Sequence, residues 1–78
     1  MTFGEAFGKG MRAERARVSM RQDELAEKVG KSRGWVGQVE SADISISLED
    51  ALAVALAIGV PFATLLADAD DDVLRSLF

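Results

Sequence analysis

Hydrophobic residues recur along this chain at the three- and four-residue spacing of an α-helix, and short polar or glycine-containing segments interrupt them. Phe3, Phe7 and Met11, together with Val18, form one apolar stripe of this kind. The stripe predicts a first helix over about residues 4–17, whose other faces are cationic. Because the helical period continues through most of the chain, the expected fold class is all-α.

The next two helices are separated by a very short turn. A second helix is predicted over residues 22–29, and it ends at Gly30, where a left-handed residue is favoured. Ser32 offers a capping hydroxyl for a third helix that runs to about Glu40. The inward positions of the two helices are Leu25, Ala26 and Val29, followed by Val36 and Val39.

Residues 41–47 lack a helical period and predict an ordered loop, in which Ile44 and Ile46 tuck under the domain. Ser47 caps a fourth helix over residues 48–58, which is rich in alanine, leucine and valine and is closed by a glycine.

The last third of the chain predicts two shorter helices. Pro61 suits the first turn of a fifth helix through about Ala67. The acidic run 70–72 suits the start of a short sixth helix, because the helix dipole favours acids there. The hydrophobic residues expected to close the core are Val60, Phe62, Leu65 and Leu66.

The net charge of −4 is unusual for a nucleic-acid-binding protein, because affinity for phosphate comes mainly from lysine and arginine. The charges are unevenly distributed, however. Residues 1–33 hold eight basic and five acidic side chains, whereas residues 34–78 hold one basic and eight acidic side chains. Such a division fits a chain with one end facing phosphate, although charges clustered by chance on a solvated surface give the same pattern.

Neither cysteine nor histidine occurs among the 78 residues. A disulfide, a thiolate nucleophile, an imidazole base and an ordinary zinc site are therefore excluded, and we expect neither metal nor cofactor. Glu49 and Asp50 are paired carboxylates at an ordinary helix start, so an enzyme is the least favoured class. The apolar stretch 51–60 is too short to span a bilayer, and the N-terminus shows no secretory signal. We expect a cytoplasmic protein with a single domain over residues 1–78.

Two helices joined by a short glycine-containing turn describe a helix-turn-helix unit, here over about residues 22–40. The segment MRQDELAEKVGKSRGWVGQVE, residues 20–40, resembles the xenobiotic-response-element, Cro and phage-repressor (C1-type) family. The likeness continues through residues 47–52 and 57–62, and so covers about residues 7–67. It implies a lambda-repressor-like domain of five to six helices. The matching residues are Gln22, Leu25, Ala26, Val29, Gly30, Ser32, Val36, Val39 and Glu40.

The resemblance implies that the helix over residues 33–40 enters the major groove of double-stranded DNA. Arg33 is then expected to contact guanine, or alternatively to clamp phosphate or to remain on the surface. Gln38, one turn after Gly34, is a second base or backbone contact, or an ordinary surface residue. Trp35 packs on a sugar or a thymine methyl group, or else between helices.

Phosphate contacts are implied at the start of the second helix and in the turn. Gln22 places an amide beside free backbone N–H groups, although it is also an ordinary polar residue for a helix start. Lys31 supplies a point charge and Ser32 supplies a hydroxyl group. Arg21 stands where the family commonly has a serine or threonine cap, so that cap is lost and a positive charge is gained.

Arg15 and Glu40 match family positions that form a partly buried ion pair between the first and third helices. Gly34 and Gly37 place two glycines in the short recognition helix, each costing about 1 kcal/mol relative to alanine. They either allow the backbone to approach DNA closely or indicate a degraded DNA reader. The loop 41–43 lacks the glycine and the basic residues that often follow the glutamate.

The function implied by the resemblance is sequence-specific transcriptional regulation at a palindromic operator, by a homodimer. We expect the dimer interface in residues 62–78 with Leu56, unless the tail folds back to complete the core. The alternative function is a protein-interaction module, antitoxin- or adaptor-like, whose acidic half binds a partner such as a toxin or a polymerase subunit. The expected interface residues, which together leave more apolar surface than a small monomer easily buries, are Leu56, Leu74, Leu77 and Phe78.

Overall fold

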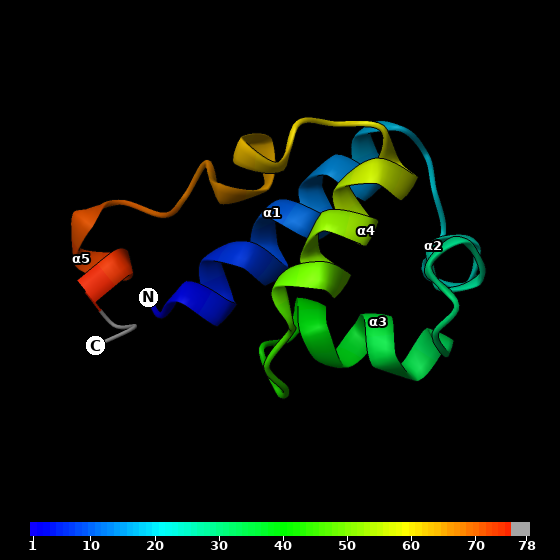
Figure 1. Ribbon diagram of the computed structural model, residues 1–78, viewed down its shortest axis with the longest axis horizontal. Coiled ribbons are helices and arrows are strands. Elements are labelled where there is room, and N and C mark those ends of the chain that lie inside the picture. Colours follow the sequence, from blue (N-terminus) through cyan, green and yellow to red (C-terminus); the bar gives the residue numbers. More distant parts are fainter. Residues whose placement is uncertain (76–78) are drawn as a thin grey trace.

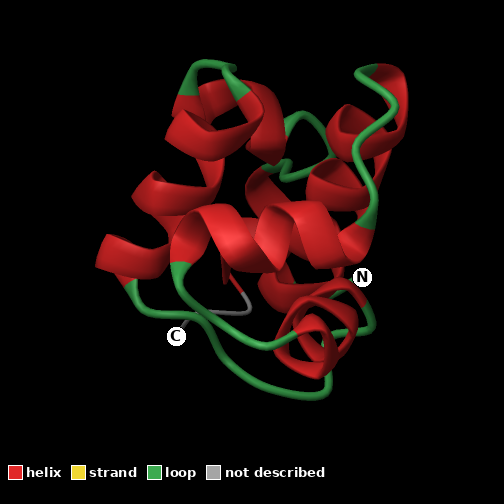
Figure 2. Cartoon of the chain, turned by 90° about the vertical axis from the view of Figure 1, so that its right-hand side faces the viewer, coloured by secondary structure: helices red, strands yellow, loops and turns green. Residues whose placement is uncertain are grey.

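The computed structural model describes residues 1–75, and within that range it contains five α-helices, one 3-10 helix and no strand (Figure 1, Figure 2). The predicted all-α fold class is confirmed. The elements are α1 (Phe3–Arg17), α2 (Gln22–Val29), α3 (Arg33–Glu40), α4 (Leu48–Ile58), η1 (Phe62–Leu66) and α5 (Asp71–Arg75).

Side-chain oxygens at the helix starts accept hydrogen bonds from backbone N–H groups that the helices leave free. The N–H of Glu5 donates to Thr2 Oγ1 at 3.1 Å, and the N–H of Thr2 donates to the Glu5 carboxylate at 2.9 Å. The bond from the Thr2 backbone lowers the pKa of the Glu5 carboxyl. Ser47 caps α4 by accepting a hydrogen bond from the N–H of Asp50 at 3.1 Å.

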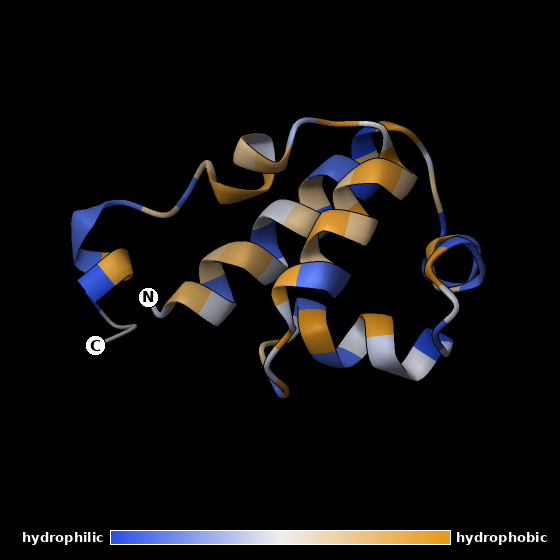
Figure 3. Cartoon of the chain, in the orientation of Figure 1, coloured by the Kyte–Doolittle hydropathy of each residue, from blue (hydrophilic) through white to orange (hydrophobic). Residues whose placement is uncertain are grey.

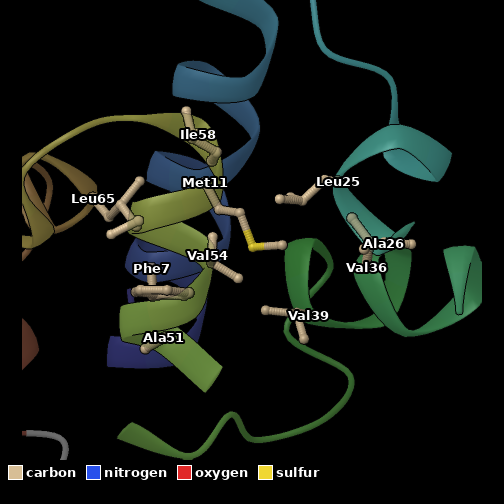
Figure 4. Packing of buried hydrophobic residues seen from close by; sticks show 11 residues of the cluster. Phe7, Met11, Leu25, Ala26, Val36, Val39, Ala51, Val54, Ile58 and Leu65 are labelled. Atoms are coloured by element: carbon tan, nitrogen blue, oxygen red, sulfur yellow. The ribbon is translucent and has the colours of Figure 1, made fainter. Parts of the chain in front are cut away.

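The core lies where α1, α4 and η1 meet the α2–α3 pair (Figure 4). Figure 4 shows the Met11 side chain extending from α1 towards Leu25 and Val39. Figure 3 shows α2 end-on, with its hydrophobic side towards α1 and α4 and its hydrophilic side away from them. Burying each large apolar side chain of this kind stabilises the fold by about 1.5–3 kcal/mol. The largest fully buried residues are Phe7, Met11, Leu25, Val36, Val54 and Leu65.

Two glycines let α1 approach its neighbours at backbone distance. A Cβ atom on Gly8 would lie 2.6 Å from the carbonyl oxygen of Glu40, at the end of α3. A Cβ atom on Gly10 would overlap the carbonyl group of Leu65 in η1. Both contacts require a residue without a side chain, and the apolar spacing of the sequence did not reveal them.

The helix expected after Pro61 is present as a five-residue 3-10 helix, in which the N–H of Thr64 donates to the Pro61 carbonyl at 2.9 Å. Such short pieces commonly take the tighter 3-10 form. One local expectation was wrong. Val18 lies beyond the end of α1, where its N–H closes the last turn of the helix, and it is 38% exposed. Its side chain therefore does not continue the buried stripe.

Candidate nucleic-acid interface

The turn between α2 and α3 presents the start of α3 to solvent. Gly30 ends α2 with φ 70°, and the N–H of Lys31 donates to the Ala26 carbonyl at 2.9 Å. Ser32 Oγ then accepts a hydrogen bond from the N–H of Trp35 at 3.0 Å and fixes the first turn of α3. The two helices are thus joined by three residues, in the arrangement of a helix-turn-helix unit.

The outer face of α3 carries two polar side chains and two glycines. Arg33, Gly34 and Gln38 are exposed and Gly37 is half-buried, while Val36 and Val39 point into the core. Because half of the outward positions have no side chain, the backbone of α3 is unusually accessible along this face. A surface of this shape allows another molecule to approach the helix closely.

A cationic depression of about 400 Å³ lies between the starts of α2 and α3. Arg33 is exposed and makes no ion pair within residues 1–75. Arg21 Nε lies 3.1 Å from Asp23 Oδ1, and this hydrogen bond raises the pKa of Arg21 and lowers the pKa of Asp23. The residues that line the depression are Arg15, Arg21, Gln22, Asp23 and Arg33.

The start of α2 lacks the side-chain cap, as its sequence predicts, because Arg21 has no acceptor to offer. Two acidic residues satisfy the backbone instead. Glu24 Oε1 accepts from the N–H of Arg21 at 3.0 Å, and Asp23 Oδ1 accepts from the N–H of Glu24 at 2.9 Å. The guanidinium of Arg21 therefore remains at the surface, where its side chain is 74% exposed.

Glu40 is a fully buried carboxylate at the end of α3, with a side-chain exposure of 0%. Arg15 donates to it from two nitrogens, Nε at 2.8 Å and Nη2 at 3.1 Å, so the ion pair expected between these residues is present in a bidentate form. Arg15 also donates to the carbonyl of Met20 at 2.8 Å. Arg12 Nε approaches the same carboxylate at 3.6 Å. This network fixes the end of α1 against both helices of the unit.

Gln22 joins the same network, which the sequence did not predict. Its Nε2 donates to Glu40 Oε1 at 3.0 Å, and the residue is half-buried. One amide hydrogen is therefore committed to the protein. A contact with an outside acceptor would use the second amide hydrogen or the backbone N–H groups beside it.

Lys31 is held by two neighbours that the sequence also did not predict. Its Nζ lies 3.4 Å from Asp50 Oδ2 and 5.5 Å from the centre of the Trp35 ring. Trp35 is half-buried and packs against the core. The charge of Lys31 is thus shared with α4, and Trp35 packs against the core while remaining partly exposed.

The comparisons with known proteins agree with this geometry. A family model described as helix-turn-helix matches residues 11–65, which is more than half of the chain. The chain belongs to the helix-turn-helix family of the Cro and phage-repressor type. No protein with a curated functional description matches the chain at a significant level.

Three solved structures are similar to this chain. The clp gene regulator ClgR from C. glutamicum has 30% identity and a TM-score of 0.84, over 88% of this chain and 90% of that chain. The restriction-modification controller protein C.AhdI from Aeromonas hydrophila has 31% identity and a TM-score of 0.76, over 80% and 94% respectively. The hypothetical transcription factor NHTF from Neisseria has 28% identity and a TM-score of 0.78, over 97% and 85%.

The residues expected at a dimer interface of this helix-turn-helix protein lie on different elements. Leu56 is on α4 and is 83% exposed, whereas Leu74 is on α5 and is 38% exposed. Leu77 and Phe78 lie outside the described residues. Leu48 and Leu52, which the sequence analysis did not single out, are 64% and 44% exposed on the same helix as Leu56.

In the part of the chain that the structure describes, no helix is long and apolar enough to cross a membrane. Within residues 1–75, no three side chains of the kinds that bind metals lie together.

Proposed function

We propose that this chain is a sequence-specific DNA-binding transcriptional regulator, which binds a palindromic operator as a homodimer through α3. The observation that supports this most strongly is the outer face of α3, where Arg33 is exposed and unpaired within residues 1–75 beside a cationic depression. The three similar proteins add support, because they are described as a gene regulator, a controller protein and a transcription factor.

In the proposed complex, the start of α3 lies in the major groove. Arg33 donates to guanine O6 and N7, and Gln38 contacts a base or the backbone one turn further along. The bare backbone at Gly34 comes close to the edges of the bases. Trp35 turns its exposed edge towards a sugar or a thymine methyl group.

Phosphate contacts in the proposed complex come from the rim of the depression. Arg21 supplies a charge whose side chain is 74% exposed, although it is shared with Asp23, and Gln22 contributes its second amide hydrogen and the N–H groups of the first turn of α2. Ser32 and Lys31 contact the backbone from the turn. Because Lys31 is shared with Asp50, its contribution is smaller than that of a free lysine.

A second function is favoured by one observation, the exposed leucines of α4. A protein-interaction module would use such a surface, together with the acidic second half of the chain, to bind a protein partner. A module of this kind would have little affinity for DNA.

Binding to a fluorescent duplex of mixed sequence, measured by anisotropy across a salt series, tests the proposal. We expect binding at low salt that weakens steeply, because the logarithm of the association constant falls by roughly 0.9 for each phosphate contact over a tenfold rise in salt. Arg33→Ala should weaken binding several-fold. The control Arg75→Ala removes the same charge from α5, far from α3 in Figure 1, and should have no effect. Absent binding at low salt, or equal effects of the two variants, would favour the protein-interaction module.

A further inference from the structure

One face of α4 is apolar and is only partly covered within residues 1–75. Leu48, Leu52 and Leu56 follow each other at four-residue spacing and are 64%, 44% and 83% exposed. A neighbouring face of the same helix holds the residues that pack into the core, Ala51, Val54, Ala55 and Ile58. Single exposed leucines are ordinary on a protein surface, but three in a row on one helix mark an interaction site. We call Leu48, Leu52 and Leu56 the leucine stripe.

Opposite charges stand at the two ends of the leucine stripe, on the same flank. Glu49 adjoins the stripe at the start of α4. Lys28 of α2 lines a shallow surface with Ala53, Leu56 and Ala57 near the other end. Both side chains are exposed, and neither makes an ion pair within 4.0 Å among residues 1–75. Glu24 and Glu27 also border Lys28, on a second shallow surface that no residue of α4 lines.

We propose that a second copy of this chain covers the leucine stripe, with the two α4 helices antiparallel across a two-fold axis at Leu52. In this arrangement Leu52 meets the partner's Leu52, and Leu48 meets the partner's Leu56. The two-fold axis lies in the plane between the two α4 helices and is perpendicular to both. Rotation about this axis reverses the direction of α4 but leaves each flank of the helix on the same side of the dimer. Lys28 therefore faces the partner's Glu49, and the reverse contact forms at the other end. A symmetric pairing of this kind is self-complementary in both shape and charge.

The same axis meets one requirement for binding a two-fold operator. Because Lys28 belongs to α2, and each flank keeps its side, α2 of both copies lies on the same side of the dimer. A two-fold operator requires this arrangement. The role of this pairing in DNA binding rests on the proposed function. The pairing itself requires no DNA. An interface of standard size takes about 800 Å² from each partner, so residues that flank the stripe must also take part.

A charge exchange tests the pairing, measured by sedimentation equilibrium at low salt without DNA. The unmodified protein should be a dimer at micromolar concentration. Lys28→Glu and Glu49→Lys should each raise the dimer dissociation constant roughly tenfold, because each places like charges together at both ends of the interface. The double variant should restore the original constant. A monomeric unmodified protein, or a double variant no better than the single ones, would overturn the proposal.

Two leucine variants locate the interface independently. Leu56→Glu should yield folded monomers, because Leu56 is 83% exposed in the single chain and its replacement disturbs no internal packing. Leu74→Glu on α5, which packs against α1 at the far end of the molecule in Figure 1, should leave the dimer intact. If Leu74→Glu dissociates the dimer and Leu56→Glu does not, the interface lies in the tail and the proposal is wrong. Because these measurements contain no DNA, a failure of the proposed dimer can be distinguished from a failure of the proposed DNA binding.

Discussion

Glu40 is the residue on which the helix-turn-helix unit depends most. Its carboxylate is buried, and it accepts hydrogen bonds from Arg15 at the end of α1 and from Gln22 at the start of α2. A buried carboxylate is stable only with such partners, and the partners in turn need the carboxylate. The position therefore fixes the angle between three helices, and it does so without contributing to the exposed face of α3.

Glu40→Ala should lower the free energy of unfolding by about 3 kcal/mol, because it leaves the guanidinium of Arg15 without its partner in a largely buried place. Thermal denaturation should therefore show a clear drop in melting temperature, while the sequence preference for DNA stays unchanged. Asp68→Ala, at an exposed position between η1 and α5, is the control and should change stability by less than about 0.5 kcal/mol. An unchanged melting temperature for Glu40→Ala would contradict this account of the network.

Ala42 is held in a conformation that suits glycine. Its φ of 60° is in the left-handed region, which costs an ordinary residue about 1–2 kcal/mol. Ala42→Gly should therefore stabilise the protein by up to about 1 kcal/mol, after the loss from the greater freedom of glycine in the unfolded chain. Chemical denaturation should show a higher midpoint. Ala13→Gly, on the exposed side of α1, is the opposite control and should destabilise by about 1 kcal/mol. A lower midpoint for Ala42→Gly would show that this strain is absent.

At the scale of elements, the sequence predicted the helices well because their starts and ends are chemically marked. Ser32, Ser47 and Gly30 stand at the boundaries that the structure has. The sequence predicted a helix after Pro61 but not its 3-10 form, because a five-residue piece has too few turns to show a period. The close approaches at Gly8 and Gly10 depend on how α1 crosses α3 and η1, and no local pattern records a crossing.

Gly10→Ala should destabilise the protein by about 1–2 kcal/mol. The added methyl group would overlap the backbone of Leu65, and this overpacking exceeds the gain in helix propensity. Gly4→Ala is a matched control on the same helix, since its methyl group would meet the side chain of Ala42 at an ordinary 3.8 Å. It should stabilise by up to about 1 kcal/mol. Melting temperatures that change in the same direction for both variants would contradict the close packing of α1 on η1.

Gly34→Ala separates the two interpretations of a glycine-rich recognition helix. The new methyl group has room, with Ser32 Oγ at 3.8 Å as its nearest neighbour, so the variant should be more stable by up to about 1 kcal/mol. If the bare backbone approaches DNA, the same variant should bind duplex DNA several-fold more weakly. Denaturation and anisotropy on one sample measure both effects. A more stable variant with equal or higher affinity would indicate that Gly34 only weakens the helix.

At the scale of the whole molecule, the sequence predicted which residues lie at the site better than it predicted the contacts between them. Arg33 was expected on the exposed start of α3, and the structure places it there. The sharing of Lys31 with Asp50, and of Gln22 with Glu40, joins residues about twenty positions apart, and no short motif contains both members. Of the leucine stripe, Leu56 was expected at an interface, but Leu48 and Leu52 were overlooked, because only the packing of α4 shows which of its leucines stay outside.

Selection of duplexes from a random pool by the purified protein, at low and at physiological salt, tests the central claim most directly. We predict a two-fold symmetric motif whose half-sites are about one turn of DNA apart, since the two α3 helices of a dimer are related by symmetry. Arg33→Ala should lose preference at one base pair of each half-site, by about 1–3 kcal/mol. No enriched motif at either salt concentration would contradict the assignment of this chain as a sequence-specific regulator.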